Sequence, residues 1–448
     1  SFILLSSVIY FLLQMSQLSL WGDELWTLSR MSIDYSDLIK PGFLYDPNYP
    51  LPVAFFKLSA YIFGSENANI IVLANLTFVL FIFLGLRLVR KYLSLEESIL
   101  LLALMFSSEY FIRMYLELKP YALMFSLSFL FSCLYVRFYF DREDKIFFST
   151  VLIGLLLSLV HPLAGLFVCS IFASNLLLTT SNFKKIFLIL GICFPILVLF
   201  LYARLSTEGI YMKLTFNHIR NAFVFMIPVV VLFLMVVYFQ YQRNFSKIRQ
   251  SFLLYLPVIL SLSIIYLYSL IVHPLFQGRY FTIFFPLTCL VLILASTEDF
   301  YKIKYPIIVT CLLSVIFLYG PRSKVPYTNF QDLILQSHHE GCLSAPIFFN
   351  DTETPQRNNI NNLYIEMYLT ASKYYSKNHQ RPLKTYREIV YSIDELVKKY
   401  PDCKIFGAAG QGEEEIFTER INRDLKERDL DRNILIEEIK ARNCIKPG

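Results

Sequence analysis

The chain has 448 residues, of which 56% are hydrophobic and only 17% are charged, whereas soluble proteins carry about 25% charged residues. Apolar runs of about 20 residues recur up to Tyr319 and then stop, which predicts a polytopic helical membrane protein and excludes a single soluble domain. The net charge of +6 lies wholly before Pro321, and no basic stripe with interleaved aromatic residues predicts a nucleic-acid partner.

The lengths of the apolar runs predict about eleven transmembrane helices. They cover residues 2–20, 67–86, 98–115, 120–138, 146–160, 163–180, 186–203, 221–240, 252–271, 281–296 and 305–320. Alternate loops between them are short and basic, beginning with Arg87, Arg90 and Lys91. By the positive-inside rule these loops are cytoplasmic, so we expect an integral protein of the plasma or bacterial inner membrane whose other loops and C-terminal region are extracytoplasmic.

The first outer loop, residues 21–52, is a polar segment between two apolar ones. It carries Asp23 and Glu24 directly after the first span, followed by Asp46 and Tyr49. Carboxylates beside lipid are costly and mark candidate functional sites, although a solvated loop anchored by tryptophan at the headgroups accounts for the same composition.

Two stretches near this loop, residues 34–40 and 52–63, combine helical spacing with an aromatic, amphipathic face. Such a pattern predicts helices that lie in the membrane interface, or short packing segments. No internal repeat is evident, which argues against a transporter built from inverted halves.

The composition becomes that of a soluble domain from Pro321, so we predict a membrane domain over residues 1–320 and an extracytoplasmic domain over 321–448. In the second domain, apolar runs bounded by turn residues predict two strands, and longer periodic segments predict three helices. The strands are residues 344–351 and 403–410, and the helices are residues 360–376, 392–400 and 413–441. The expected fold is therefore an all-α membrane bundle with a small C-terminal α/β domain.

Several charged or titratable residues fall at span ends on the predicted outer face. They are Glu117, Lys119, His161, Arg279 and Tyr280, in addition to the two acids after the first span. Each has a plain structural explanation, since cations at span ends anchor helices by snorkelling and a histidine before proline caps a helix. Their convergence on one face nevertheless indicates a site on that side of the membrane.

The order of these motifs resembles the GT-C membrane glycosyltransferases across residues 1–320. W-G-D-E-L-W-T-L at 21–28 and D-P-N-Y-P-L-P at 46–52 resemble the first outer loop of the branch that holds protein O-mannosyltransferases and the lipid A aminoarabinose transferase. Y-L-E-L-K-P-Y-A-L at 115–123 is similar to the second-loop pattern of that branch. His161-Pro162 matches a polar third-loop position, and G-R-Y-F at 278–281 matches the Arg-Tyr that opens a late span.

The resemblance implies transfer of a sugar from a polyprenyl-phosphate carrier to a protein, glycolipid or polysaccharide acceptor, with inversion. Asp23 would be the general base that takes the proton of the acceptor hydroxyl, and Glu24 would orient the acceptor or the base. Arg279, Lys119 and Tyr280 would hold the phosphate, whose negative charge grows as it leaves. The remaining candidate contacts to acceptor or donor are His161, Glu117, Asp46 and Tyr49.

The sequence departs from that branch at two positions, since relatives often carry Arg where this chain has Lys119 and His-Pro-Pro where it has the segment that begins with Tyr49. A lysine supplies a point charge in place of a bidentate fork, and it still suits a phosphate.

Three alternatives remain for the function. A metal-dependent oligosaccharyltransferase-like enzyme would use Asp23, Glu24, Asp46 and Glu117 around a divalent cation, although we expect no cofactor because hard cations require several oxygen ligands at once. A transporter or lipid flippase would place ionisable residues near mid-membrane. A membrane scaffold that displays the C-terminal domain would give Asp23 and Glu24 no functional role.

Overall fold

The computed structural model describes part of the chain and divides it into two compact units. The first unit comprises residues 1–16 and 34–323, and the second comprises residues 17–33 and 324–448. The described residues are 22–31, 50–64, 67–106, 118–141, 143–178, 245–271, 278–296, 304–309, 311, 347–349, 383–385, 406–409 and 435–438.

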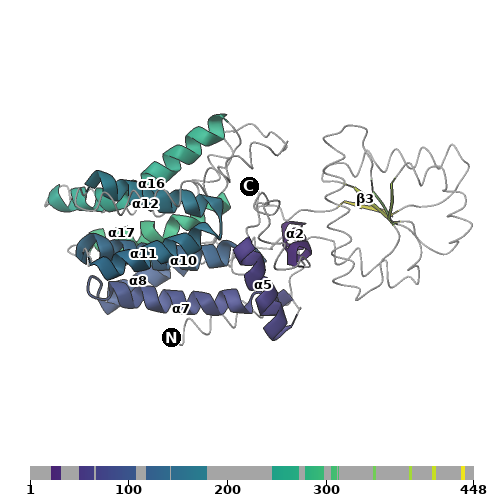
Figure 1. Cartoon of the computed structure of the whole chain (residues 1–448), viewed down its shortest axis with the longest axis horizontal. Coiled ribbons are helices and arrows are strands. Elements are labelled where there is room, and N and C mark those ends of the chain that lie inside the picture. Colours follow the sequence, from purple (N-terminus) through teal and green to yellow (C-terminus); the bar gives the residue numbers. More distant parts are fainter. Residues whose placement is uncertain are drawn as a thin grey trace, which may run out of the picture. The chain divides into compact units, whose positions relative to one another are not determined.

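The first unit is a bundle of apolar helices that lie side by side (Figure 1). Its helices are α7 (Val72–Val89), α8 (Leu95–Phe106), α10 (Tyr121–Asp141), α11 (Asp144–Ser158), α12 (Pro162–Leu178), α16 (Phe245–Ile271) and α17 (Phe285–Ser296). Within the described residues, three stretches are long and apolar enough to cross a membrane: Val72–Val89, Tyr121–Asp141 and Arg249–Leu270. This finding agrees with the hydropathy of the chain and indicates a membrane protein.

The predicted spans coincide with helices where the structure describes them, with two differences. The span 67–86 is divided into a short helix (Asn67–Ile70) and α7, and the span 281–296 begins within a 3₁₀ helix (Gly278–Ile283) that precedes α17. The spans predicted at 120–138, 146–160 and 163–180 are the helices α10, α11 and α12. The predicted spans 2–20, 186–203 and 221–240 lie outside the described residues, so the expected total of about eleven spans stays a prediction.

Helix α10 is the centre of the bundle, because almost all of its side chains are buried and it packs on α7, α11, α12 and α17. Its Phe131 ring packs edge-on against Phe167 and Phe172 of α12, at centroid distances of 6.1 and 6.4 Å. Aromatic side chains bury a large apolar area, so such contacts fix the spacing and register of neighbouring helices.

Helices α7 and α10 approach each other closely at Gly85 of α7. A Cβ atom at this position would lie 2.6 Å from a ring carbon of Phe129 and 3.1 Å from Sγ of Cys133, both on α10. Small residues at helix contacts let backbones approach inside membranes, where packing rather than hydrophobic exclusion drives association. Gly85 therefore holds the register between the two helices.

Helix α5 (Pro50–Phe63) crosses the end of the bundle where α7 begins (Figure 1). Ser59 fastens it there, since its Oγ donates to the carbonyl oxygen of Asn69 at 2.7 Å and accepts from the backbone N–H of Leu73 at 3.1 Å. The short helix α6 (Asn67–Ile70) follows Gly64, whose φ of +101° is a backbone conformation that suits glycine. The helix predicted over residues 52–63 is thus confirmed.

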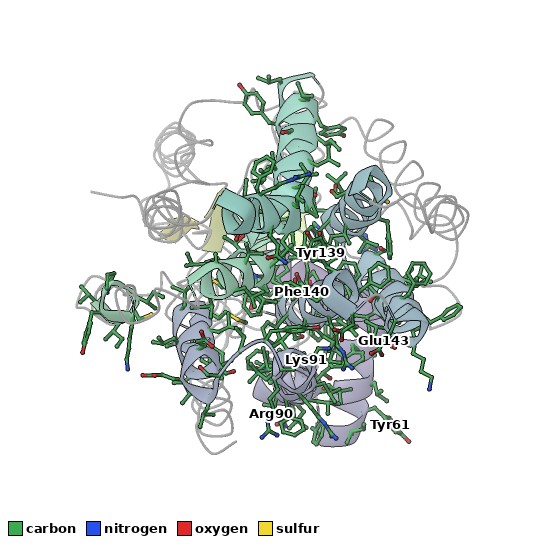
Figure 2. All side chains as sticks on the ribbon, turned by 90° about the vertical axis from the view of Figure 1, so that its left-hand side faces the viewer. Tyr61, Arg90, Lys91, Tyr139, Phe140 and Glu143 are labelled. Carbon is green, nitrogen blue, oxygen red and sulfur yellow. The ribbon has the colours of Figure 1, made fainter. Side chains whose placement is uncertain are left out.

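The far end of α5 exposes apolar side chains. Tyr61 is 87% exposed, and Leu58, Ile62 and Phe63 are also exposed; Figure 2 shows Tyr61 at the periphery, pointing away from the other helices. An apolar surface on a helix across the end of a bundle is typical of helices in the interface. The other helix predicted in this loop, residues 34–40, lies outside the described residues.

The second unit contains helix α2 (Gly22–Met31) and a four-stranded parallel sheet of order β2-β1-β3-β4. The strands are β1 (Ile347–Phe349), β2 (Leu383–Thr385), β3 (Phe406–Ala409) and β4 (Leu435–Glu438). The strands predicted at 344–351 and 403–410 are confirmed as β1 and β3. The three predicted helices lie mainly outside the described residues, so the α/β arrangement of this domain stays a prediction.

One local prediction in this region is wrong. The charged segment 413–441 was expected to be helical throughout, but Leu435–Glu438 form strand β4, which pairs in parallel with β3. Pairing with a neighbouring strand overrides local helical preference, because strand formation depends on cross-strand context more than on intrinsic propensity. Strand β2 was not predicted either, and its sequence Leu-Lys-Thr is too short to give a periodic pattern.

Candidate functional site

The beginnings of α7, α10 and α12 lie at one end of the bundle, which we name the Lys119 end. Three contacts establish this arrangement: Gly85 of α7 faces Phe129 of α10, Lys91 after α7 bonds Asp141 at the end of α10, and Tyr121 of α10 lies near His161 before α12. The three helices therefore run in the same direction. The opposite end, with Lys91 and Asp141, is named the Lys91 end.

Lys119 lies two residues before α10 and is buried, with a relative exposure of 7%. Its neighbours Leu118 and Tyr121 are buried as well. A buried ammonium group is costly unless anionic or hydrogen-bonding neighbours compensate it, so such a lysine is rare outside functional sites. Snorkelling to water does not describe this lysine, because its side chain is not exposed.

His161 occupies the residue before α12 and is also buried, at 8% exposure. Its Nδ1 accepts a hydrogen bond of 3.2 Å from the backbone N–H of Leu163, while Pro162 takes the first helical position, where no N–H is required. The capping explanation for this histidine is therefore confirmed. Because Nδ1 is an acceptor, the neutral ring carries its hydrogen on Nε2, which leaves Nε2 as the donor.

Lys119 and His161 are both neighbours of Tyr121, Lys119 in sequence and His161 in space. The centroids of the Tyr121 and His161 rings are 6.2 Å apart, and Tyr121 is two residues after Lys119. The structure thus places two of the predicted residues, from two different loops, at the same end of neighbouring helices.

Arg279 and Tyr280 lie in the 3₁₀ helix η1 (Gly278–Ile283), which packs on both α10 and α12. Ser128 of α10 donates a hydrogen bond to the carbonyl oxygen of Ile283, and the Phe284 ring stacks edge-on against Phe167 of α12 at 5.3 Å. The backbone of Arg279 precedes this anchored position by about one turn of 3₁₀ helix. The element that carries Arg279 is thus fixed against the same two helices that carry Lys119 and His161.

Asp23 and Glu24 lie in the first turn of α2, in the second unit. Acidic side chains are favoured in a first turn by the helix dipole, and Arg30 lies correspondingly in the last turn. The side chain of Glu24 is completely buried, and Thr27, one turn later, is buried as well. The sequence predicted a loop at this point, whereas residues 22–31 are helical, so both acids are held on a regular element.

The remaining predicted site residues, Asp46, Tyr49 and Glu117, lie outside the described residues. Among the residues that are described, no three His, Cys, Asp or Glu side chains are grouped so that they could hold a metal ion. Of the four carboxylates that the metal-dependent alternative requires, this finding covers only that of Glu24.

The sequence analysis missed one polar residue at the Lys119 end, Asn75 in the first turn of α7. Its side chain is completely buried on the face of α7 that also carries Phe78, Ile82 and Gly85. A lone amide inside an otherwise apolar run is the signal that could have identified it, because an amide in a membrane span is costly without hydrogen-bond partners.

The comparisons add no family to this picture. No protein-family model, curated protein or solved structure matches the chain.

Proposed function

We propose that the protein is a membrane glycosyltransferase that moves a sugar from a polyprenyl-phosphate carrier to an acceptor on the extracytoplasmic side. One observation carries the proposal: a buried lysine and a buried histidine occur at the same end of neighbouring helices, and the element with Arg279 packs on the same two helices. Buried cationic and donor groups at the end of a membrane bundle suit an anionic group carried on a lipid, such as a phosphate.

In this proposal the Lys119 ammonium and the Arg279 guanidinium stabilise the phosphate, and Tyr280 lies beside Arg279 as a further contact. These groups act mainly as the phosphate leaves, since its negative charge increases when its bond to the sugar breaks. His161 supplies a donor through Nε2, because its Nδ1 is engaged with the backbone of α12.

Asp23 is the proposed general base. The acceptor hydroxyl oxygen forms a bond to the anomeric carbon while the bond from that carbon to the phosphate oxygen breaks, and the hydroxyl proton passes to the Asp23 carboxylate. Attack from the face opposite to the leaving group inverts the anomeric centre. Glu24 orients Asp23 or the acceptor, with Glu117, Asp46 and Tyr49 as further candidate contacts, and the reaction requires no metal ion.

The proposed architecture is a bundle of about eleven spans with interfacial helices in the first outer loop, and an α/β domain over residues 321–448 on the extracytoplasmic side. Two observations support it. The basic turns bounding α7 and α10 meet at the Lys91 end, as a cytoplasmic face requires. The parallel strands need long crossover connections, for which residues 350–382, 386–405 and 410–434 provide the length.

The first test is sugar transfer in membranes from a panel of polyprenyl-phosphate-linked sugars, with wild type compared to Asp23→Asn. We expect transfer by the wild type from one of these donors and none by the variant, whose amide cannot accept the proton. Both proteins should be equally abundant and equally monodisperse after detergent extraction.

Equal transfer by both proteins would remove Asp23 as the base. Transfer that depends on an added divalent cation and stops with a chelator would favour the oligosaccharyltransferase-like alternative. No transfer from any donor by a folded wild type would contradict the proposal and favour a transporter or flippase.

A further inference from the structure

The carbonyl oxygen of Asn75 is a buried hydrogen-bond acceptor that the described fold leaves unused. The amide Nδ2 donates to the carbonyl oxygen of Ile71 at 3.0 Å, but Oδ1 meets no donor among the residues that the structure describes. The side chain is 0% exposed. Buried polar atoms in folded proteins are almost always hydrogen-bonded, so this exception is an acceptor that can still receive a hydrogen bond from a ligand.

The position of Asn75 follows from the register between α7 and α10. Gly85 faces Phe129 and Cys133, so Asn75, ten positions earlier on α7, lies at the level of the start of α10, between Lys119 just before that helix and Leu123 in its first turn. The step is the same on both helices because every α-helix rises by about 1.5 Å per residue. Helices α7 and α10 pack against each other within the bundle seen in Figure 1.

Asn75 also lies on the buried side of α7 that packs against α10. Its amide is therefore at the level at which Lys119 enters α10 and Tyr121 meets His161. The buried hydroxyl groups of Tyr135 and Ser170 likewise have no described partner, but they lie further along α10 and α12, away from this level.

The chemistry of the carbonyl oxygen decides what it can bind. An amide oxygen accepts hydrogen bonds and cannot donate them, so it disfavours the oxygen atoms of a phosphate. A hydroxyl group is a suitable partner. A ligand with a phosphate at one end and hydroxyl groups beside it would match a lysine and a buried amide oxygen at the same level.

We propose that Oδ1 of Asn75 accepts a hydrogen bond from a hydroxyl group of the sugar carried by the lipid-linked donor. Asn75 is then a specificity-determining residue, which recognises a hydroxyl group of the sugar while Lys119 and Arg279 bind the phosphate. This inference rests on the proposed function and adds to it the recognition of a hydroxyl-bearing sugar at the start of α7.

The test compares wild type with Asn75→Leu, an apolar side chain of similar size. The probes are undecaprenyl phosphate, the undecaprenyl-phosphate-linked hexose that the donor panel identifies, and the set of its monodeoxy analogues. Two quantities are measured: the midpoint of thermal unfolding in detergent with and without each probe, and KM for transfer.

Four results are expected. Without a probe, Asn75→Leu should unfold at the same temperature as wild type or higher, because an unsatisfied buried acceptor has been removed. Undecaprenyl phosphate should stabilise both proteins equally. The hexose-linked donor should have a KM roughly tenfold higher for the variant, and one monodeoxy analogue should raise KM roughly tenfold for wild type without raising it further for the variant.

The matched control is Thr77→Val on the same helix. Thr77 Oγ1 donates to the backbone carbonyl of Leu73 at 2.7 Å, so its hydroxyl is already used within the helix, and KM should not change. The inference is overturned if Asn75→Leu keeps the wild-type KM, or if it discriminates against the same monodeoxy analogue as wild type. A lower unfolding temperature with unchanged KM would also overturn it, since Asn75 would then be only structural.

The glycosyltransferase function and the role of Asn75 are distinguished by different outcomes. If no lipid-linked sugar stabilises wild type or serves as a donor, the glycosyltransferase function fails, and the role of Asn75 fails with it. If wild type uses a donor and Asn75→Leu uses it equally well, only the role of Asn75 is wrong.

Discussion

The two ends of the bundle differ in the exposure of their polar side chains, which reach water at the Lys91 end and are buried at the Lys119 end. At the Lys91 end, Asp141 accepts hydrogen bonds from Lys91, from the hydroxyl of Tyr92 and from Nε of Arg137, the last at 3.2 Å. The side chains of Lys91 and Arg137 are partly exposed, at 50% and 29%. Charges that are paired and reach water in this way are inexpensive to keep.

Neighbouring contacts extend this pattern across the Lys91 end. Ser94 and Glu97 form a capping box at the start of α8, with bonds of 2.7 and 3.2 Å between each backbone N–H and the other side chain. Lys304 pairs with Glu96. In Figure 2, which looks at the bundle from this end, Arg90, Lys91, Phe140 and Glu143 are labelled on it.

The Lys119 end instead keeps its polar residues away from water. Lys119, His161 and Asn75 are all at least nine-tenths buried, and the carbonyl oxygen of Asn75 has no hydrogen-bond partner among the described residues. The burial of polar groups costs desolvation free energy that their contacts must offset, so a concentration of such groups at one end is typical of a functional site. The difference between the ends is the main reason to place the chemistry at the Lys119 end.

The strongest test of the difference between the two ends is Lys119→Met, which replaces the buried cation with an apolar chain of similar length. We expect transfer activity to fall by roughly 10- to 100-fold, because a charged contact to phosphate is lost. The unfolding temperature should fall moderately while the protein stays folded, because removal of one member of a buried charged contact is usually destabilising. Transfer kinetics and thermal unfolding in detergent measure both effects.

A control for this prediction is Lys91→Met at the other end. Lys91 is exposed and belongs to the Asp141 cluster, so its replacement should leave transfer unchanged. If Lys119→Met loses stability and keeps its activity while folded, the buried lysine is structural, and the two ends do not differ in the way described.

A smaller effect is expected at Gly85, the contact that sets the level of Asn75 relative to Lys119. Gly85→Ala would place a methyl group 2.6 Å from the Phe129 ring, and overpacking of this kind destabilises by about 1–3 kcal/mol. Gly165→Ala is the matched control on α12, because its Cβ would meet Ser158 at an ordinary 3.7 Å and the change favours helix. Chemical or thermal unfolding compares the two.

The double variant Gly85→Ala with Phe129→Leu should recover part of the lost stability, because the smaller side chain leaves room for the methyl group. If Gly85→Ala is as stable as Gly165→Ala, α7 and α10 do not approach at this point. The level assigned to Asn75 would then lose its basis.

The sequence predicted the helices of the bundle well, because an apolar run of membrane length has few other outcomes. The range 120–138 became α10 and 163–180 became α12, since in lipid the backbone must satisfy its own hydrogen bonds. The predicted cap at His161 also follows from local chemistry, because a polar side chain before proline and an apolar run suits a helix start.

Residues whose role depends on partners distant in sequence could not be read in this way. Asn75 is a single polar residue in an apolar run. Its position at the level of the start of α10 follows from the register between α7 and α10, which Gly85 and Phe129 determine. Strand β4 was predicted as helix because its four residues alone do not indicate that it pairs with β3. The burial of Lys119 likewise depends on packing, and its position at a span end predicted an exposed anchor as readily as a buried ligand.

The smallest effect expected is a pH dependence of the unfolding temperature that arises at the Lys91 end. It measures how strongly the contacts of Asp141 stabilise that end. Burial, followed by the hydrogen bond to Asp141, raises the pKa of Tyr92 to about 12, against about 10 in an unfolded chain. A raised pKa means that the folded state retains the proton more strongly. The stabilisation from Tyr92 is therefore complete below about pH 10 and is lost as the pH rises towards 12.

Tyr92→Phe removes this titration while keeping the ring that packs against Phe140 at 4.8 Å. Lys91, whose pKa is also raised, chiefly by its hydrogen bond to Asp141 and then by one to Tyr92, titrates in both proteins, so the difference between them reports Tyr92 together with its contact to Lys91. Between about pH 9.5 and 11.5 the unfolding temperature of wild type should fall more steeply than that of the variant. Parallel curves would mean that the Tyr92 hydroxyl does not hold Asp141, which would then be held by Lys91 and Arg137 alone among the described residues.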